Sequence, residues 1–210
     1  MSVQPPCHPA SHSTLLLVPH SLPDPDTPAW PALAFQALGD LVERAPGLTV
    51  AVFERPSEQR RAELALSGLV EIVQLAEQGW QVHALGDGVV LTSREGAARR
   101  PELLRSARVL VVSRLPLPWP RSPRAGAPAG EDPRRFLCHD LPRSVEAFHG
   151  VVAPFLVAIH GQPRLLVVLD PRLVDRPYGR WFLHALAGLP RCRELDEAIA
   201  HLSAGPGVTP

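Results

Sequence analysis

Apolar residues along the chain follow two alternating patterns. Short continuous apolar runs rich in Val and Leu, typical of strands buried on both faces, occur at 14–18, 48–53, 80–85, 88–92, 108–112 and 164–169. Helical periodicity fills the intervals at 30–44, 57–78, 95–105, 143–160, 176–187 and 193–203. Strands separated by helices predict an α/β domain, in which helices cover both faces of a mostly parallel sheet.

The segment 143–160 carries the clearest helical pattern. Its apolar residues recur at the spacing of a single helix face, so we expect this face to pack on the core. The residues of this stripe are Val145, Phe148, Val152, Phe155, Leu156 and Ile159.

Segments rich in Pro, Gly and small polar residues mark the connections. Residues 1–13 and 204–210 predict flexible tails on either side of a single domain at 14–203. The segment 114–133 holds many of the prolines and predicts an extended surface loop. Gly86-Asp87-Gly88 separates two strand patterns and predicts a hairpin turn; a phosphate-binding loop is disfavoured there because no helical pattern follows.

The composition narrows the chemistry that the chain can perform. The 21 basic residues balance the 21 acidic ones, so no overall field indicates a nucleic-acid or membrane-surface protein. The chain contains no Lys, which excludes the lysine of a phosphate-binding loop and a Schiff-base mechanism. Cys7, Cys138 and Cys192 lack the spacing of a metal or redox site. Together with the lack of a signal or membrane-spanning pattern, they predict a cytoplasmic protein with reduced thiols and no metal site.

Two common kinds of catalytic site find no support in the sequence. The nine histidines are scattered, and no pair combines His-x-x-x-His spacing with a carboxylate base between its two members. Neither a Gly-x-Ser-x-Gly elbow nor a Gly-x-Gly-x-x-Gly turn after the first strand is present. A hydrolase triad and a Rossmann dinucleotide site are therefore disfavoured.

Arginines gather in and beside the proline-rich segment, with a tryptophan among them. Guanidinium groups neutralise phosphates and an aromatic ring stacks on bases, which is how single-stranded nucleic acid is bound. The alternative is a solvated loop in a protein whose every basic residue is Arg. The candidate nucleic-acid residues are Arg114, Trp119, Arg121, Arg124, Arg134 and Arg135.

Four segments in this order resemble a known family: LLLVPHSLPDPDTPAW (15–30), LTVAVFERPSEQRR (48–61), REGAARRPELLRSARVLVVSRLPLPWPRSP (94–123) and VVLDPRLVDRPYGRWFLHAL (167–186). They are similar to the second RecA-like motor domain of the DinG/XPD group of superfamily 2 DNA helicases. The last segment, with its Leu-Asp-x-Arg, Tyr-Gly and Phe-Leu spacing, is the most specific. The resemblance implies a three-layer RecA-like domain that lacks the phosphate-binding loop itself.

The resemblance also implies that parts needed for catalysis lie elsewhere. In the family, a first RecA-like domain carries the phosphate-binding loop, the magnesium-binding acidic box and often an iron–sulfur cluster. No corresponding motif occurs in this sequence. ATP and magnesium are the family's cofactors, and we expect this chain to bind neither alone.

The family's own catalytic motifs in the second domain are altered here. Glu95 and Gly96 match the start of a Glu-Gly-Val-Asp motif, but two alanines follow. The family places a Gln-x-x-Gly-Arg-x-x-Arg helix before the VVLD strand, and counting back from Asp170 puts Phe155 and Ala158 at the arginine positions and Val151 at the Gln. Phe cannot neutralise a γ-phosphate.

Near VVLD, the resemblance puts Asp170 and Arg172 on the nucleotide side, whereas Pro171 and Tyr178-Gly179 are expected to hold a strand-to-helix corner.

Three hypotheses for function stay open at this point. The first is a helicase-type second domain without ATPase activity that still binds single-stranded DNA or docks a partner. The second is an interaction scaffold without a nucleic-acid role, whose apolar face around Phe155 binds a protein or a second copy. The third is a second motor domain that works in trans with a separately encoded helicase N-terminal domain.

Overall fold

A computed structural model describes residues 14–68, 72–73, 88–118, 133–157, 162–186 and 188–204. The predicted strand at 80–85, the start of the turn at Gly86-Asp87, and both predicted tails apart from Ala204 lie outside these residues. Within the described part, no helix is long and apolar enough to cross a membrane.

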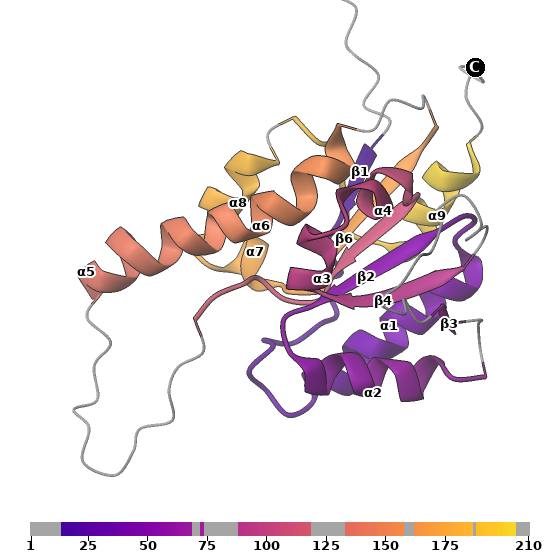
Figure 1. The fold of residues 1–210 in the computed structure, drawn as a ribbon, viewed down its shortest axis with the longest axis horizontal. Helices are drawn as coiled ribbons and strands as arrows, with labels where there is room; N and C mark the ends of the chain where they lie inside the picture. The colour runs from indigo at the N-terminus through magenta and orange to yellow at the C-terminus, as the bar shows by residue number, and fades with distance from the viewer. Residues whose placement is uncertain are drawn as a thin grey trace, which may run out of the picture.

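Seven parallel strands form one sheet in the described residues, in the order β3-β4-β2-β5-β6-β1-β7 (Figure 1). The five longer strands are nearly fully buried, as their continuous apolar sequences require. The strands are β1 (Thr14–Leu17), β2 (Thr49–Phe53), β3 (Ile72–Val73), β4 (Val89–Ser93), β5 (Val109–Val112), β6 (Arg164–Val168) and β7 (Arg191–Cys192).

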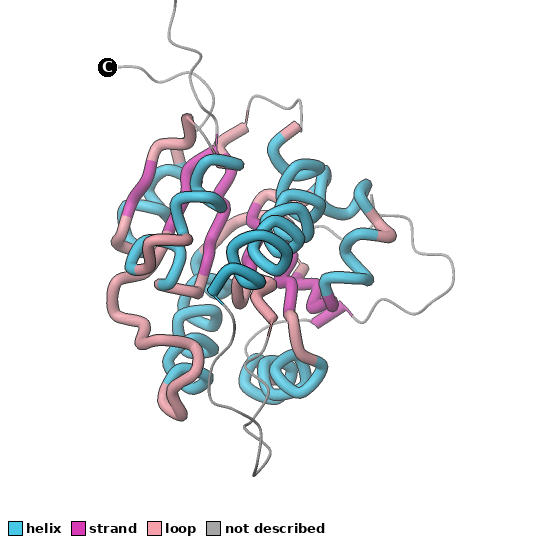
Figure 2. Tube along the Cα trace, turned by 90° about the vertical axis from the view of Figure 1, so that its left-hand side faces the viewer, coloured by secondary structure: helices cyan, strands magenta, loops and turns pink. Residues whose placement is uncertain are grey.

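Helices cover both faces of this sheet and make the three-layer architecture that the sequence predicts (Figure 2). One apolar core lies between the sheet and α1 (Trp30–Arg44), α2 (Pro56–Leu66) and α9 (Leu195–Ser203). The other core lies under the helices α3 (Arg94–Ala98), α4 (Pro101–Ser106), α6 (Leu141–Leu156), α7 (Arg172–Asp175) and α8 (Gly179–Ala185).

The α6 helix is the last part of a long helical segment at 133–156, which we call the rod. Two shorter segments lead into it, α5 (Pro133–Arg135) and the π-helical turn η2 (Phe136–Asp140). The rod projects beyond the sheet in Figure 1 and points toward the viewer in Figure 2. Its predicted apolar face does meet the core, where Phe148, Val152 and Phe155 are buried and Val145 and Leu156 are partly buried; Ile159 lies outside the described residues.

The structure corrects the boundaries of two predicted helices and adds one strand. The helix expected at 57–78 ends at Leu66, and β3 lies inside that range. The helix expected at 95–105 is two helices, because Pro101 lacks the N–H that a continuous helix needs and instead begins α4. The two-residue strand β7 was too short to show a pattern and was not predicted.

Candidate functional site

Charged residues gather where the parallel strands end. Asp24 and Asp26 follow β1, Glu54 and Glu58 follow β2, and Arg114 follows β5. Asp170 and Arg172 follow β6 in the same way. Because all strands are parallel, their carboxyl ends meet at one edge, which is where open α/β sheets bind ligands.

Arg114 lies at the centre of this edge and is buried, with 5% of its surface exposed. Its guanidinium stacks on the Trp30 ring at 4.2 Å from the centroid, and Nη1 donates to Asp26 Oδ1 at 3.2 Å. Arg114 Nε lies 2.7 Å from Glu58 Oε1, but its N–H is not directed at that oxygen. The prediction of Arg114 as a surface-loop residue that contacts nucleic acid is therefore wrong, since internal carboxylates and an aromatic ring enclose its charge.

Asp170 is fully buried, and both of its oxygens are hydrogen-bonded within the chain. Oδ1 accepts from the backbone N–H of Arg172 at 3.1 Å, and Oδ2 accepts from the backbone N–H of Leu115 at 2.9 Å. The Arg172 guanidinium donates to both oxygens and reaches Asp26 Oδ2 at 3.2 Å. Burial lowers the pKa of Arg172, but its bonds and charge interaction with Asp170 outweigh this and raise the pKa above its usual value.

Two further ion pairs at this edge are partly exposed to solvent. Arg176 pairs with Asp24 at 3.0 Å, and burial of Asp24 is outweighed by this bond and by the Asp26 backbone N–H, so the pKa of Asp24 is lowered. Arg94 pairs with Glu54 at 3.0 Å. Burial raises the pKa of Glu54, and it raises that of Glu58 despite the neighbouring arginines.

We call the whole set the edge network; its residues are Asp24, Asp26, Glu54, Glu58, Arg94, Arg114, Asp170, Arg172 and Arg176. Each of these arginines faces a carboxylate of the same chain. Glu58 Oε2, Ser113 Oγ and Arg114 Nε are buried without a hydrogen-bond partner; of these only Arg114 carries positive charge, and that charge is paired with Glu58 and Asp26. The edge network therefore does not fit a nucleoside triphosphate, whose phosphates need cations that are not already paired with carboxylates. Nor do the described residues bring three or more His, Cys, Asp or Glu side chains together as a metal site.

Glu95 and Gly96 lie at the same edge, at the start of α3. Glu95 is exposed, and the Gly96 N–H donates to Ser93 Oγ at 3.1 Å, which caps the helix. Since β4 and β6 are three strand positions apart, Glu95 lies about 14 Å along the edge from Asp170. The predicted remnants thus share an edge without forming one cluster.

Phe155 lies at the opposite edge of the sheet. It is fully buried, and the Arg164 guanidinium stacks on its ring at 3.8 Å from the centroid. Arg164 opens β6, so the six residues to Asp170 separate the two sites by about 20 Å. Because Phe155 is fully buried, the prediction of an apolar docking face that includes it is wrong. Val151 is also buried, and Ala158 lies outside the described residues.

Arg164 joins the ends of two helices beneath the sheet. It donates to the carbonyl of Leu104 within α4 and to that of Ala107 just after α4. It also donates to the carbonyl of Phe155 in α6. Burial lowers the pKa of Arg164 to about 10. Helix C-termini carry partial negative charge, which stabilises the cation there.

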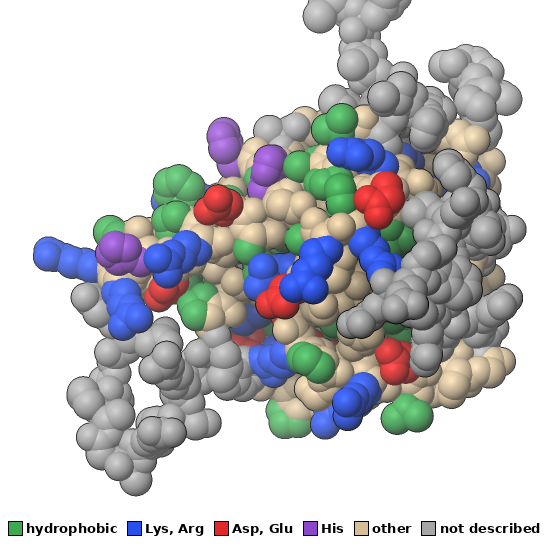
Figure 3. All heavy atoms as spheres, viewed as in Figure 1, with side chains coloured by type: hydrophobic (Ala, Val, Ile, Leu, Met, Phe, Trp, Pro, Cys, Tyr) green, Lys and Arg blue, Asp and Glu red, His purple; other side chains and the backbone are tan. Residues whose placement is uncertain are grey.

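Of the remaining nucleic-acid candidates, Arg134 and Arg135 are exposed at the free end of the rod, in α5. Exposed His139 and Arg143 follow in η2 and α6. Figure 3 shows Arg and His side chains gathered at this projecting end. Trp119, Arg121 and Arg124 lie outside the described residues.

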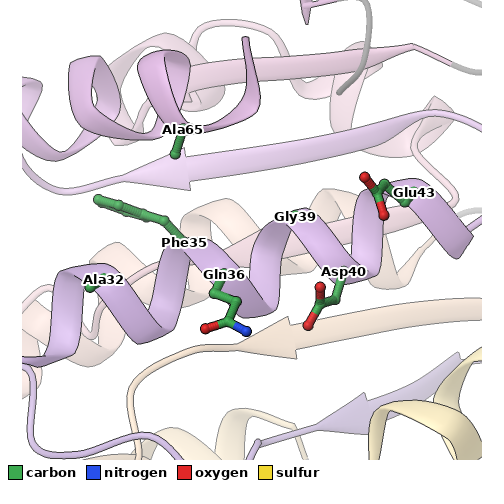
Figure 4. Close-up of a pocket in the computed structure, with 7 residues that line it drawn as sticks. All are labelled: Ala32, Phe35, Gln36, Gly39, Asp40, Glu43 and Ala65. Carbon is green, nitrogen blue, oxygen red and sulfur yellow. The ribbon is translucent and has the colours of Figure 1, made fainter. Parts of the chain in front are cut away.

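A shallow groove runs between α1 and α2, on the face of the sheet opposite α6 (Figure 4). Its floor contains Phe35, Gly39 and Ala65, and Asp40 and Glu43 lie at one end. None of the predicted site residues lines it. The groove is thus separate from the edge network and from the basic end of the rod.

Sequence reasoning missed the partners that enclose Arg114, namely Trp30, Asp26 and Glu58. A usable signal existed for the aspartates, because Pro23-Asp24-Pro25-Asp26 follows a buried strand. Trp30 and Glu58 fall within helical patterns, and nothing in those patterns marks their contact with Arg114.

Comparison with known proteins places the fold. No protein-family model matches the sequence, and neither does any curated protein. Among solved structures, an XPD helicase is similar with a TM-score of 0.58 and 12% identity, over 86% of this chain and 35% of that one. A structure described as S. tokodaii Xpd4 matches with a TM-score of 0.45 and 11% identity, over 86% and 38%. The chain thus spans about a third of the length of these proteins. The first similarity confirms the predicted α/β fold of the RecA-like type.

Proposed function

We propose that the chain is a helicase-type second motor domain that binds single-stranded nucleic acid and does not hydrolyse ATP on its own. One contrast carries the proposal. The arginines of the edge network face internal carboxylates, whereas Arg134 and Arg135 are exposed at the projecting end of the rod.

Geometry supports the rod as the contact surface. A helix that stands clear of the body can lie along a phosphate backbone without collision, and guanidinium groups can donate to two phosphate oxygens at once. The similarity in fold to an XPD helicase supports nucleic acid as the ligand class. Docking onto a separate helicase N-terminal domain is the second candidate, since the carboxyl edge of the sheet presents Arg176 and Glu95 to solvent.

Paired substitutions test the binding proposal. Arg134→Ala with Arg135→Ala should weaken binding of a fluorescein-labelled oligothymidine by about tenfold at low salt. It should also flatten the dependence of log Kd on log salt by about 1.4, because roughly 0.7 is expected for each phosphate contact of a single strand. Fluorescence anisotropy across a salt series measures both quantities.

The matched control is Arg60→Ala with Arg61→Ala, another exposed adjacent pair on a helix, α2. This variant should bind like the wild type. Equal weakening by both variants would show only a general charge effect, and a wild type without salt-dependent binding would overturn the proposal.

A further inference from the structure

Trp181 is a large aromatic residue that the fold leaves in contact with solvent. It lies in the first turn of α8, and 52% of its surface is exposed. The Arg180 guanidinium lies 5.8 Å from the centroid of its ring. The next residue, Phe182, is fully buried and packs edge-on against Phe148 of α6 at 5.5 Å. Burial of Phe182 therefore fixes the helix that presents Trp181 outward.

A second aromatic contact connects this turn of α8 to the basic end of the rod. Tyr178 lies one helical turn before Trp181 and packs edge-on against Phe136, with ring centroids 5.6 Å apart. Phe136 directly follows Arg134 and Arg135 in the chain. This contact, between residues more than forty positions apart in sequence, thus brings the start of α8 next to the segment that carries Arg134 and Arg135.

This combination has a known physical use. A ring with a free face stacks on nucleic-acid bases whatever their identity, and nearby guanidinium groups neutralise the backbone. Arg180 and Arg135, both exposed, take part in none of the salt bridges found among the described residues.

We infer that Trp181 is the base-stacking residue of a single-strand binding surface formed by the first turn of α8 and the basic end of the rod. The inference rests on the proposed function and adds the group that contacts the bases. The arginines of the rod supply the contact to phosphates, and the Arg180 guanidinium lies over the indole ring.

The test separates bases from backbone by using two probes of equal length, an oligothymidine and an abasic oligonucleotide with the same phosphates. Trp181→Ala should weaken oligothymidine binding by about five- to a hundredfold, the range found when a stacking residue is removed. The same variant should bind the abasic probe like the wild type. Trp181→Phe should restore most of the oligothymidine affinity. Arg134→Ala with Arg135→Ala should weaken binding of both probes.

Leu33→Ala is the control, because Leu33 is an exposed apolar residue on the other side of the sheet. It should bind both probes normally, and thermal unfolding should be unchanged in Trp181→Ala. If Trp181→Ala binds oligothymidine like the wild type while the arginine variant is weakened, the stacking role is wrong and the proposed function stands. If the wild type binds neither probe, both are wrong.

Discussion

Gly179 decides whether the chain can turn from α7 into α8. A Cβ at this position would overlap the carbonyl oxygen of Leu173 and lie 2.7 Å from that of Arg172. Both are backbone atoms, which cannot rotate away as a side chain would. The Tyr178-Gly179 pair therefore permits the close approach of two short helices, in agreement with a corner-forming role.

Gly179→Ala should destabilise the fold by about 2 kcal/mol or more, because backbone must shift to admit the methyl group. Urea unfolding followed by circular dichroism measures the change. Gly150→Ala is the matched control, since Gly150 lies in α6 with no atom within 4 Å of an added Cβ. That change should stabilise the protein by about 0.5–1 kcal/mol through helix propensity. A neutral Gly179→Ala would contradict the close packing of this turn.

Arg114 is the residue through which separate elements meet at the carboxyl edge. It follows β5 and contacts Glu58 of α2, Trp30 of α1 and Asp26 of the segment between β1 and α1. Burial lowers the pKa of Arg114, opposed by Glu58. Since Arg114 and Glu58 are both buried, each compensates a charge that the interior would otherwise disfavour.

Arg114→Met should cost about 3 kcal/mol of folding free energy, because it leaves the Glu58 carboxylate buried without its main counter-charge. Adding Glu58→Gln should recover at least half of that loss, as measured by a double-mutant cycle in urea. The comparison is Arg44→Met at the exposed Arg44–Asp196 pair, where both side chains are well exposed; there the change should stay within about 1 kcal/mol. A double variant as unstable as the sum of both singles would rule out this coupling.

Elements with long regular patterns could be predicted from the sequence, and contacts between them could not. The strands β2 and β6 and the helix α1 lie where the apolar pattern placed them, because burial on both faces or on one stripe leaves a local signature. By contrast, β3 and β7 are two residues long and owe their pairing to neighbouring strands. Arg114 was expected in a surface loop, and Arg164 was not singled out in the sequence. Their burial depends on partners up to 88 residues away, which no local pattern contains.

At the scale of the whole molecule, the charge is arranged in two different ways. The carboxyl edge of the sheet, where RecA-like folds are expected to face nucleotide, balances its arginines with internal carboxylates. The rod carries exposed arginines away from the body. The proposed nucleic-acid contact on the rod is therefore separate from the carboxyl edge of the sheet.

The isolated chain should neither bind nor hydrolyse ATP. With Arg172 held by Asp170 and Asp26, a triphosphate would have to break ion pairs that are already formed, and the gain would not offset that loss. Saturating Mg-ATP should therefore shift Tm by less than about 2 °C, since a ligand at a hundred times its Kd stabilises by about 2.7 kcal/mol and would shift Tm further. Phosphate release should stay at the level of a reaction without protein, with or without oligothymidine. A larger Tm shift that Arg172→Ala abolishes would show that the edge network opens to accept nucleotide, and would return the chain to the class of ATP-using motor domains.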